Sequence, residues 1–475
     1  METPLDDFHQ YKLEKEQWVT GHTGSSTLEV VEVNVVCLVS YWAWLAWKTY
    51  RDNGRLPQPE QRSLSSFMAT YGFFIVPLIL SCTNIPYRLP LMGAMVALGA
   101  VFFAGIQPRS AEDLHRDSDD LKIDTAALPP RRAYISVYRS VLMIMTCVCI
   151  LAVDFPIFPR SYAKVETYGT SLMDIGVGSF VFSAGIVGAR AYLPGNHREA
   201  NKSFATKLAE SLKMSLALFV LGIGRMLSVK GAEYQEHVSE YGVHWNFFFT
   251  LGLLPVSICL CQVLWPSPAV TGSVLALGYQ LALTYGGWEE FVLHAPRVDL
   301  LSMNKEGILG FIGYLSISLL AIALGRLLLV SDPKAGNNLR RPLMLMALGG
   351  GIWCVFLVVE SWIGIPVSRR LVNLPYILWT VSFNFPFVVG FALIEYLVNW
   401  KAGITRIPDH DTNIPWGLSN FNRFGLSTFL VANILTGLVN FSIKTLYASD
   451  VQSLAILLAY MLVVFIYVTL RAVWA

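Results

Sequence analysis

The segment between residues 153 and 174 carries the side chains that are best suited to chemistry. Its charged side chains, which lie between two strongly apolar runs, include the carboxylates of Asp154 and Asp174 and the ammonium group of Lys164. A half-buried carboxylate beside a cation can accept a proton from a substrate hydroxyl, while the ammonium group stabilises charge that develops on an oxygen. The structural alternative, which these residues leave open, is an interfacial ion pair in which Arg160 or Lys164 neutralises Asp154.

The surrounding residues predict how this segment is folded. Pro156 and Pro159 stop the helix that arrives from residues 142–153, so Asp154 is expected at a helix end and Lys164 beyond a turn, close to each other at the bilayer edge. Asp174 lies a few residues into the next apolar run, where an ionisable residue usually marks a functional path. Equally, Asp174 could start a helix, where the helix dipole favours an acid.

A second polar segment covers residues 233–246 and contains two histidines. If it is helical, four of its polar residues share one face and could bind a polar headgroup or a divalent metal. A metal is disfavoured because the spacing matches no recognised zinc motif and Gly242 interrupts the helix, so we predict no metal site. The alternative is a polar face at the membrane interface, with Trp245 as an aromatic anchor. The four residues are Glu233, His237, Glu240 and His244.

Two further groups precede apolar runs. Arg369 and Arg370 could bind a lipid phosphate through paired hydrogen bonds, or simply end a helix at the headgroup layer. Asn304 could cap the helix that follows it, with no other role.

The composition sets the class of protein. Of the 475 residues, 54% are hydrophobic and 14% are charged, well below the roughly 25% charged residues of a soluble domain. The net charge is +2 and the basic residues are scattered, which argues against nucleic acid as a partner. All seven cysteines lie in apolar runs and indicate packing residues, with no disulfide framework and no redox pair.

Thirteen apolar runs approach the ~20 residues that a spanning helix needs. We therefore expect an all-α, polytopic integral membrane protein that forms a single domain over residues 1–475, with a short polar tail over residues 1–29. The expected spans are 30–47, 67–83, 89–106, 135–153, 172–188, 213–227, 245–265, 269–285, 307–330, 343–361, 375–397, 425–443 and 454–470.

The distribution of basic residues predicts the orientation. Segments that follow odd-numbered spans hold roughly twice as many Lys and Arg residues as those that follow even-numbered spans, and cytoplasmic loops carry the excess. The N-terminus and the polar segments described above are therefore expected on the lumenal side, and the C-terminus in the cytosol. We find no internal repeat, which weakens, without removing, the alternative of a lipid transporter or flippase with an intramembrane acid-base network.

Several phrases of the chain resemble the inositol acyltransferases of glycosylphosphatidylinositol (GPI) anchor synthesis. This family is known in fungi as GPI-anchored wall transfer protein, and its animal member is PIG-W. The resemblance extends over nearly the whole chain. The matching phrases are AVDFPIFPR (152–160), AKVETYGTSLMD (163–174), EYQEHVSEYGVHWNF (233–247), NKEG (304–307), VSRRLVNLPY (367–376) and NILTGLVN (433–440).

The resemblance implies a multi-pass enzyme of the endoplasmic reticulum membrane. It would transfer a fatty acyl group, typically palmitoyl, from acyl-CoA to the inositol hydroxyl of glucosaminyl-phosphatidylinositol. The family's proposed catalytic acid and lysine fall on Asp154 and Lys164. Asp154 would take the proton from the hydroxyl, while Lys164 would support the oxyanion or orient Asp154. We expect acyl-CoA as co-substrate, no tightly bound cofactor, membrane lipids as partners and no obligate protein partner.

The same resemblance suggests which residues contact the substrates. The substrate-binding candidates are Arg160, Glu166, Thr167, Tyr168, Ser171, Asp174, His237, Glu240, His244, Trp245, Asn246, Asn304, Arg369, Arg370 and Asn373. An apolar tunnel between helices is expected to hold the acyl chain, with each buried methylene contributing about 0.8 kcal/mol.

Overall fold

The structure is a computed structural model of an all-α protein. Among the residues that the structure describes, ten helical segments are long and apolar enough to cross a membrane. They confirm ten of the thirteen predicted spans, whereas the exact count of thirteen is not confirmed. The described residues are 10–11, 13–15, 17–18, 20–52, 58–83, 88–108, 131–193, 196, 199, 201–231, 239–265, 267–330, 339–404 and 410–474.

The ten segments follow the predicted runs closely. Two of them contain a π-helical stretch, and one ends in a 3₁₀ turn. They are α2 (Thr27–Asp52); α3 (Leu64–Thr70), η1 (Tyr71–Ile75) and α4 (Val76–Ser81) together; α5 (Arg88–Gly105); α7 (Ala133–Ala152); α8 (Leu172–Gly188) with η3 (Ala189–Tyr192); α15 (Lys305–Leu329); α16 (Arg340–Leu357) with η4 (Val358–Trp362); α17 (Leu374–Lys401); α19 (Gly425–Ser442); and α20 (Asp450–Trp474).

The other three predicted spans are helical too, but they differ in form. The sixth corresponds to α10 (Phe204–Gly231). The seventh and eighth correspond to α11 (Phe247–Leu264) and α12 (Pro268–Tyr285), which are bent by 109° relative to each other, as in a broken span or a re-entrant pair. Shorter helices lie between the long ones: η2 (Arg160–Tyr162), α13 (Trp288–His294), α14 (Leu300–Met303), α18 (Trp416–Arg423) and η5 (Thr445–Tyr447).

Among the candidate spans, α7 is the most enclosed, because 78% of the residues in its most apolar stretch are buried. Only 11% are buried in the corresponding stretches of α5 and α19, which lie at the periphery. Small residues bring the central helices together. A Cβ atom at Gly185 of α8 would lie 2.6 Å from the Ala321 Cβ of α15, and one at Gly178 would lie 2.6 Å from the Thr380 hydroxyl of α17. In lipid, such close backbone approach is the main source of helix association. The core therefore forms where α7, α8, α15 and α17 meet.

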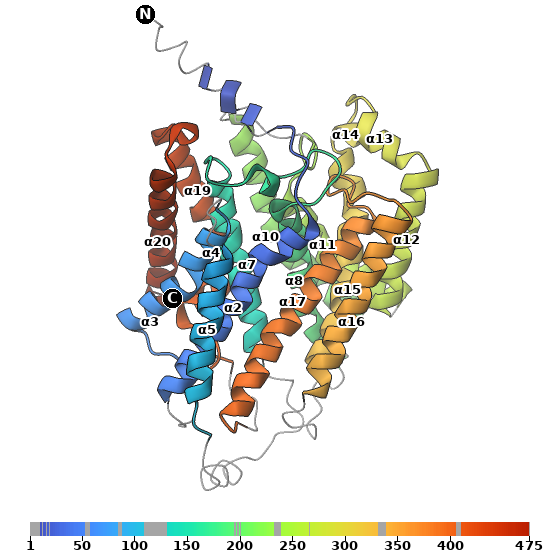
Figure 1. Cartoon of the computed structure of the whole chain (residues 1–475). Coiled ribbons are helices and arrows are strands. Elements are labelled where there is room, and N and C mark those ends of the chain that lie inside the picture. The colour runs from blue at the N-terminus through green and yellow to red at the C-terminus, as the bar shows by residue number, and fades with distance from the viewer. Residues whose placement is uncertain are drawn as a thin grey trace, which may run out of the picture.

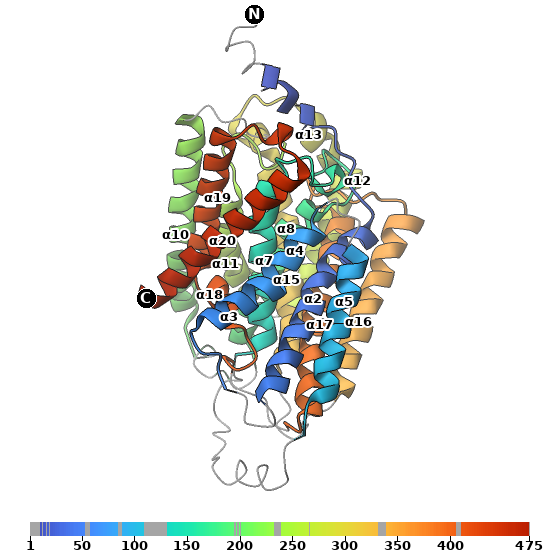
Figure 2. The same ribbon diagram turned by 60° about the vertical axis from the view of Figure 1, so that its left-hand side comes forward.

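Figure 1 shows the helices packed into one bundle, with α13, α14 and the N-terminal segment at the same end. We call this end of the bundle the site end. In the rotated view of Figure 2, α20 runs away from the site end and carries the C-terminus toward the other end.

Candidate functional site

Loops from distant parts of the sequence meet at the site end. The loop between α7 and α8, residues 153–171, lies at the centre of their contacts. Its Thr167 carbonyl accepts a hydrogen bond of 2.6 Å from the Ser368 hydroxyl, and the Gly169 N–H donates to the Val367 carbonyl at 2.8 Å. The Val243 N–H donates to the Met303 carbonyl at 2.9 Å. The polar segments predicted to share one side of the membrane therefore do lie at one end of the bundle.

The predicted break before residue 160 is confirmed, because α7 ends at Ala152 and a 3₁₀ turn follows at Arg160. The Arg160 guanidinium is used to hold this turn. Its Nη2 donates to the carbonyls of Val153 at 2.9 Å and Phe155 at 3.1 Å. Burial lowers the pKa of Arg160 to about 10, and the Asp154 carboxylate acts in the opposite direction.

Asp154 is held by residues that the sequence did not suggest. Its side chain is 12% exposed, its Oδ2 accepts a 2.7 Å hydrogen bond from Asn440 Nδ2, and its Oδ1 lies 3.4 Å from Lys15 Nζ. Within the part of the chain that the structure describes, neither Lys164 nor Arg160 forms an ion pair with Asp154. The predicted pairing of Asp154 with Lys164 is therefore wrong, because Lys15 takes that place.

Lys164 instead belongs to a second charged group, which we call the four-charge network: Lys164, Glu240, Arg369 and Asp174. The Lys164 ammonium donates to Glu240 Oε1. Arg369 Nη2 lies 3.4 Å from the same oxygen, and Arg369 Nε lies 2.8 Å from Asp174 Oδ1. Burial alone would lower the pKa of Arg369, but the carboxylates of Glu240 and Asp174 act against it and hold the pKa above its ordinary value. The four charges sum to zero, which allows Arg369 and Asp174 to be buried while Lys164 stays partly exposed.

Asp174 confirms the predicted position of an acid at a helix start, whereas its functional role stays a prediction. It lies in the first turn of α8, where Ser171 caps the helix by accepting the Asp174 N–H at 3.1 Å. Its side chain is fully buried and pairs with Arg369. The Oδ2 atom also accepts hydrogen bonds from the Ser171 hydroxyl at 2.6 Å and from the Val165 N–H at 3.1 Å. Asp174 therefore fixes the backbone next to Lys164.

A third group is built on Glu306, whose side chain has no exposure. Arg297 binds it in a bidentate manner, at 2.6 Å and 3.0 Å, and Arg370 Nη2 donates to it at 3.0 Å. The neighbours Arg369 and Arg370 thus pair with different carboxylates. The side chains of Arg370 and Arg297 are 18% and 25% exposed, whereas that of Arg369 is 5% exposed. This Arg297–Glu306–Arg370 group carries a net positive charge.

The loop over residues 239–246 is not helical, so the predicted polar stripe does not form in it. His237 and Glu233, the other members of that stripe, lie outside the described residues. Asn304 does not cap its helix with its side chain. Its Oδ1 instead accepts the N–H groups of His244 at 2.8 Å and Trp245 at 2.9 Å. For the described part of the chain, no group of three residues suits a metal ion.

Gly242 and Val372 show how tightly these loops are set. Gly242 has a φ of +114°, and a Cβ atom there would lie 2.5 Å from the Asn304 Cα. Val372, next to the two arginines, has a φ of +51°, which is a strained conformation for a β-branched residue. Such strain persists only where the surroundings enforce it. Here, Val372 packs against Gly313, where an added Cβ would lie 2.3 Å from the Val372 carbonyl oxygen.

The remaining predicted residues make structural contacts. The Tyr168 hydroxyl donates to Glu289 of α13, and burial, followed by this carboxylate, raises the pKa of Tyr168. Glu166 Oε1 accepts the N–H of Gly21 at 3.2 Å. Asn246 caps α11 by accepting the Phe248 N–H at 3.0 Å, and Asn373 caps α17 by accepting the Tyr376 N–H at 3.2 Å.

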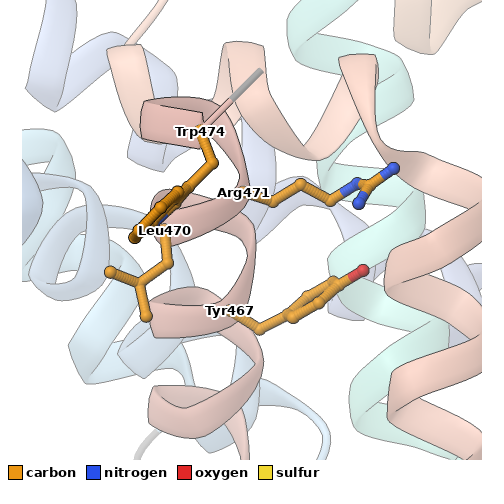
Figure 3. Close-up of a pocket in the computed structure, with 4 residues that line it drawn as sticks. All are labelled: Tyr467, Leu470, Arg471 and Trp474. Carbon is orange, nitrogen blue, oxygen red and sulfur yellow. The ribbon is translucent and has the colours of Figure 1, made fainter.

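Two of the cavities that the described residues form lie in different parts of the molecule. One, of about 470 Å³, is formed at the C-terminal end of α20 by Tyr467, Leu470, Arg471 and Trp474, which Figure 3 shows along one stretch of that helix. The other, of about 370 Å³, lies at the site end. Its lining comes from the N-terminal segment and from the linker between α19 and α20: Glu14, Gln17, Trp18, Leu446 and Tyr447.

Sequence reasoning missed Lys15, Asn440, Arg297 and Glu306 as members of these groups. Asn440 and Glu306 lie in phrases that supported the family resemblance, which was an available signal. Nothing in the local sequence around Lys15 indicated a partner, because Asp154 is brought close only by the fold. Arg297 lies nine residues before Glu306, but no motif connects the two.

Together, the fold and the site define a polytopic all-α membrane protein with a charged, loop-built site at one end. The family model described as GWT1 matches residues 11–471, so the chain belongs to the GWT1 family. This confirms the resemblance seen in the sequence.

Among its relatives are fungal proteins that bear the name GPI-anchored wall transfer protein 1. The protein from Yarrowia lipolytica is 39% identical over 476 residues, covering 94% of this chain and 95% of the relative. The one from Gibberella zeae is 37% identical over 489 residues, covering 96% of both chains. The one from Saccharomyces cerevisiae is 35% identical over 479 residues, covering 94% and 95%.

Proposed function

We propose that this protein acts in GPI-anchor biosynthesis as an acyl-CoA-dependent inositol acyltransferase. It would move a fatty acyl group, typically palmitoyl, from acyl-CoA to the inositol hydroxyl of glucosaminyl-phosphatidylinositol in the endoplasmic reticulum membrane. The observation that carries the proposal is the nearly buried Asp154 carboxylate, which is held in place by Asn440 in a chain of this family.

In the proposed mechanism, Asp154 is the general base. It takes the proton as the inositol oxygen attacks the thioester carbonyl, and a carbon–oxygen bond forms while the carbon–sulfur bond breaks. The proton then passes from Asp154 to the departing CoA thiolate, which leaves as the thiol. Because a thiolate is a good leaving group, no strong acid is needed. Enclosure of the site by the loops limits competing hydrolysis.

Lys164 is assigned to the oxyanion. Its side chain is 41% exposed, and an ammonium group has three donors, of which Glu240 takes one. The option that Lys164 orients Asp154 loses its support, because the two side chains have separate partners. Donors aimed at the developing negative charge typically change the rate by 10²–10³-fold.

The phosphate of the lipid substrate is assigned to Arg370 and Arg297. Arg369 is a weaker candidate than the sequence suggested, since two carboxylates occupy its buried guanidinium. Arg370 and Arg297 share one carboxylate, so their excess positive charge remains for an anion. An arginine fork matches phosphate geometry.

The test uses purified protein in nanodiscs with labelled palmitoyl-CoA and glucosaminyl-phosphatidylinositol. We expect wild type to form acylated lipid, and Asp154→Asn and Lys164→Met to lower turnover at least ~10²-fold. Glu290→Gln is the matched control, because its side chain is 80% exposed at the same end. Lipid movement between leaflets without acylation would favour a flippase over an acyltransferase. Full activity of both the Asp154 and the Lys164 variant would refute their assignment as catalytic residues.

The proposed orientation has its own test. Asn201-Lys202-Ser203 is a glycosylation sequon that α8 separates from the site end, and Asn201 is exposed. With a lumenal site end and N-terminus, Asn201 stays unmodified, whereas an exposed sequon engineered between α13 and α14 gains a glycan. The reverse pattern would overturn the orientation.

A further inference from the structure

The N-terminal segment, of which residues 10–11, 13–15, 17–18 and 20–26 are described, lies across the loop that carries Asp154. It makes contacts along the whole length of that loop. The Ser25 N–H donates to the Thr170 carbonyl at 2.7 Å, and Trp18 stacks on the Arg160 guanidinium at 4.2 Å. Further along, the Tyr11 hydroxyl lies 3.4 Å from that of Thr445, in the linker between α19 and α20. The segment thus joins two loops of the site end.

Glycines at the crossing point show that this arrangement is built in. Gly24 has a φ of +84°, and a Cβ atom there would lie 2.2 Å from the Thr170 carbonyl oxygen. Gly169, on the opposing loop, has a φ of +130°, and its Cβ would lie 2.6 Å from the Thr23 carbonyl oxygen. Two backbones can approach this closely only where side chains are absent on both.

Within this segment, Lys15 closes a three-membered clamp on the catalytic candidate. Its Nζ donates to Asn440 Oδ1 at 2.7 Å and lies 3.4 Å from Asp154 Oδ1. Asn440 Nδ2 in turn donates to the other carboxylate oxygen, Oδ2, at 2.7 Å. Lys15 thereby fixes the amide orientation of Asn440, and both carboxylate oxygens have a donor or a cation next to them.

The geometry points to Lys15 as a positioning residue for the reaction, which fixes the direction of the Asp154 carboxylate and places a cation beside it, where the described part of the N-terminal segment lies over the loop. This inference deepens the proposed function, on which it rests. Lys15 acts through Asp154 and not on substrate. The role of Lys15 also agrees with the one proposed for Lys164. Because Lys15 supplies the cation beside the Asp154 base, Lys164 is available for the oxyanion.

The cavity of about 370 Å³ at the site end fits this role. Glu14, Gln17 and Trp18 line it on either side of Lys15 in the sequence, and Leu446 and Tyr447 complete it. The Tyr447 hydroxyl donates to Glu14 at 2.7 Å, which ties the two walls together. The N-terminal segment is therefore a wall of a cavity next to the clamp, whose lining combines apolar side chains with the polar groups of Glu14, Gln17 and Tyr447.

Other charged groups near the clamp define the background against which Lys15 acts. Arg160, on the same loop as Asp154, is coupled to it electrostatically. Lys444 lies over the rings of Tyr11 and Tyr447, at 5.7 and 5.8 Å. Glu14 is the nearby carboxylate. Among the charged side chains that the structure describes, only that of Lys15 lies within 4.0 Å of the Asp154 carboxylate.

The test measures the pH dependence of acyl transfer in the full-length protein, using palmitoyl-CoA and glucosaminyl-phosphatidylinositol. Lys15→Gln keeps a donor to Asn440 but removes the charge, so the carboxylate loses a neighbouring cation that favours its ionised form. We expect the acidic limb of the profile to move to higher pH by about 1 unit, which corresponds to a loss of turnover of up to about tenfold on that limb. Lys15→Arg restores the charge and the wild-type profile.

Controls separate this inference from the proposed function. Lys202→Met removes the ion pair of Lys202 with Glu199, which is remote from the site, and it should leave the pH profile of acyl transfer unchanged. If Asp154→Asn is inactive while Lys15→Gln keeps the wild-type profile, the role of Lys15 is refuted and the base assignment stands. A Lys15→Arg profile shifted as far as that of Lys15→Gln also refutes it. If Asp154→Asn is fully active, both the assignment of Asp154 as the base and the proposed role of Lys15 are refuted.

Discussion

The buried pair of Arg369 and Asp174 offers the most quantitative test of how the site is held together. Asp174 has no side-chain exposure and Arg369 has 5%, and the two are 2.8 Å apart. Removing one partner of such a pair leaves an uncompensated buried charge, which costs about 3–5 kcal/mol. We predict that Arg369→Met loses stability near the lower end of that range, because Ser171 and Val165 still donate to Asp174.

A double substitution separates the charge from the packing. Asp174→Asn with Arg369→Met removes both charges and leaves Lys164 and Glu240 as a neutral pair. We expect the double variant to be more stable than the sum of the single losses predicts, by about 0.5–3 kcal/mol, since contacting residues couple by that amount.

The assay is the thermal unfolding midpoint of purified protein in one detergent, followed by intrinsic fluorescence. Arg51→Met is the matched control, because Arg51 is 45% exposed and its 3.7 Å contact with Asp52 is a surface pair worth about 0–1 kcal/mol. A midpoint for Arg369→Met equal to that of the control, or strictly additive losses in the double variant, would refute the reasoning.

Three further substitutions test the loops of the site end. Gly242→Ala adds a Cβ at a positive φ and against Asn304, so it should lower the thermal midpoint by the equivalent of about 1–3 kcal/mol, unlike Gly278→Ala, which has open space. Asn304→Ala leaves the N–H groups of His244 and Trp245 without their acceptor; we expect a loss of about 1–3 kcal/mol and faster proteolysis of that loop. Arg297→Lys replaces a bidentate bond to Glu306 by a single one, and the KM for the lipid substrate should rise while kcat is little changed.

The helices were largely predictable, because hydrophobic length is a strong signal for a chain that must satisfy its backbone in lipid. The limits of α7 and α8 follow the prediction to within a residue or two, since Pro156 and the Ser171 cap mark them locally. The α11 and α12 pair was harder to predict. Two apolar runs separated by a short linker predict two helices, but not the angle between them.

Some of the charged residues of the site end were predictable from the sequence, whereas Lys15, Asn440 and the pairings were not. Asp154, Lys164 and Asp174 stood out as charges beside apolar runs, and all three are engaged in ion pairs. Their partners are contributed by loops far away in sequence, and one charged residue in a loop is locally like another. Proximity along the chain favoured Asp154 with Lys164, whereas the 3₁₀ turn built by Arg160 directs the two side chains to different neighbours.

The contacts at the site end also decide how α11 and α12 run. The chain enters α11 just after Val243 and Trp245, which are bonded to Met303 and Asn304, and it leaves α12 close to Tyr279, whose hydroxyl donates to the Leu371 carbonyl at 2.7 Å. Both ends of the pair therefore lie at the site end. One crossing would carry those ends to opposite sides, so the bent pair must enter the bundle and return. The loop over residues 239–246 and α13 are thereby delivered to the same surface, where Glu240 meets Lys164 and Glu289 meets Tyr168.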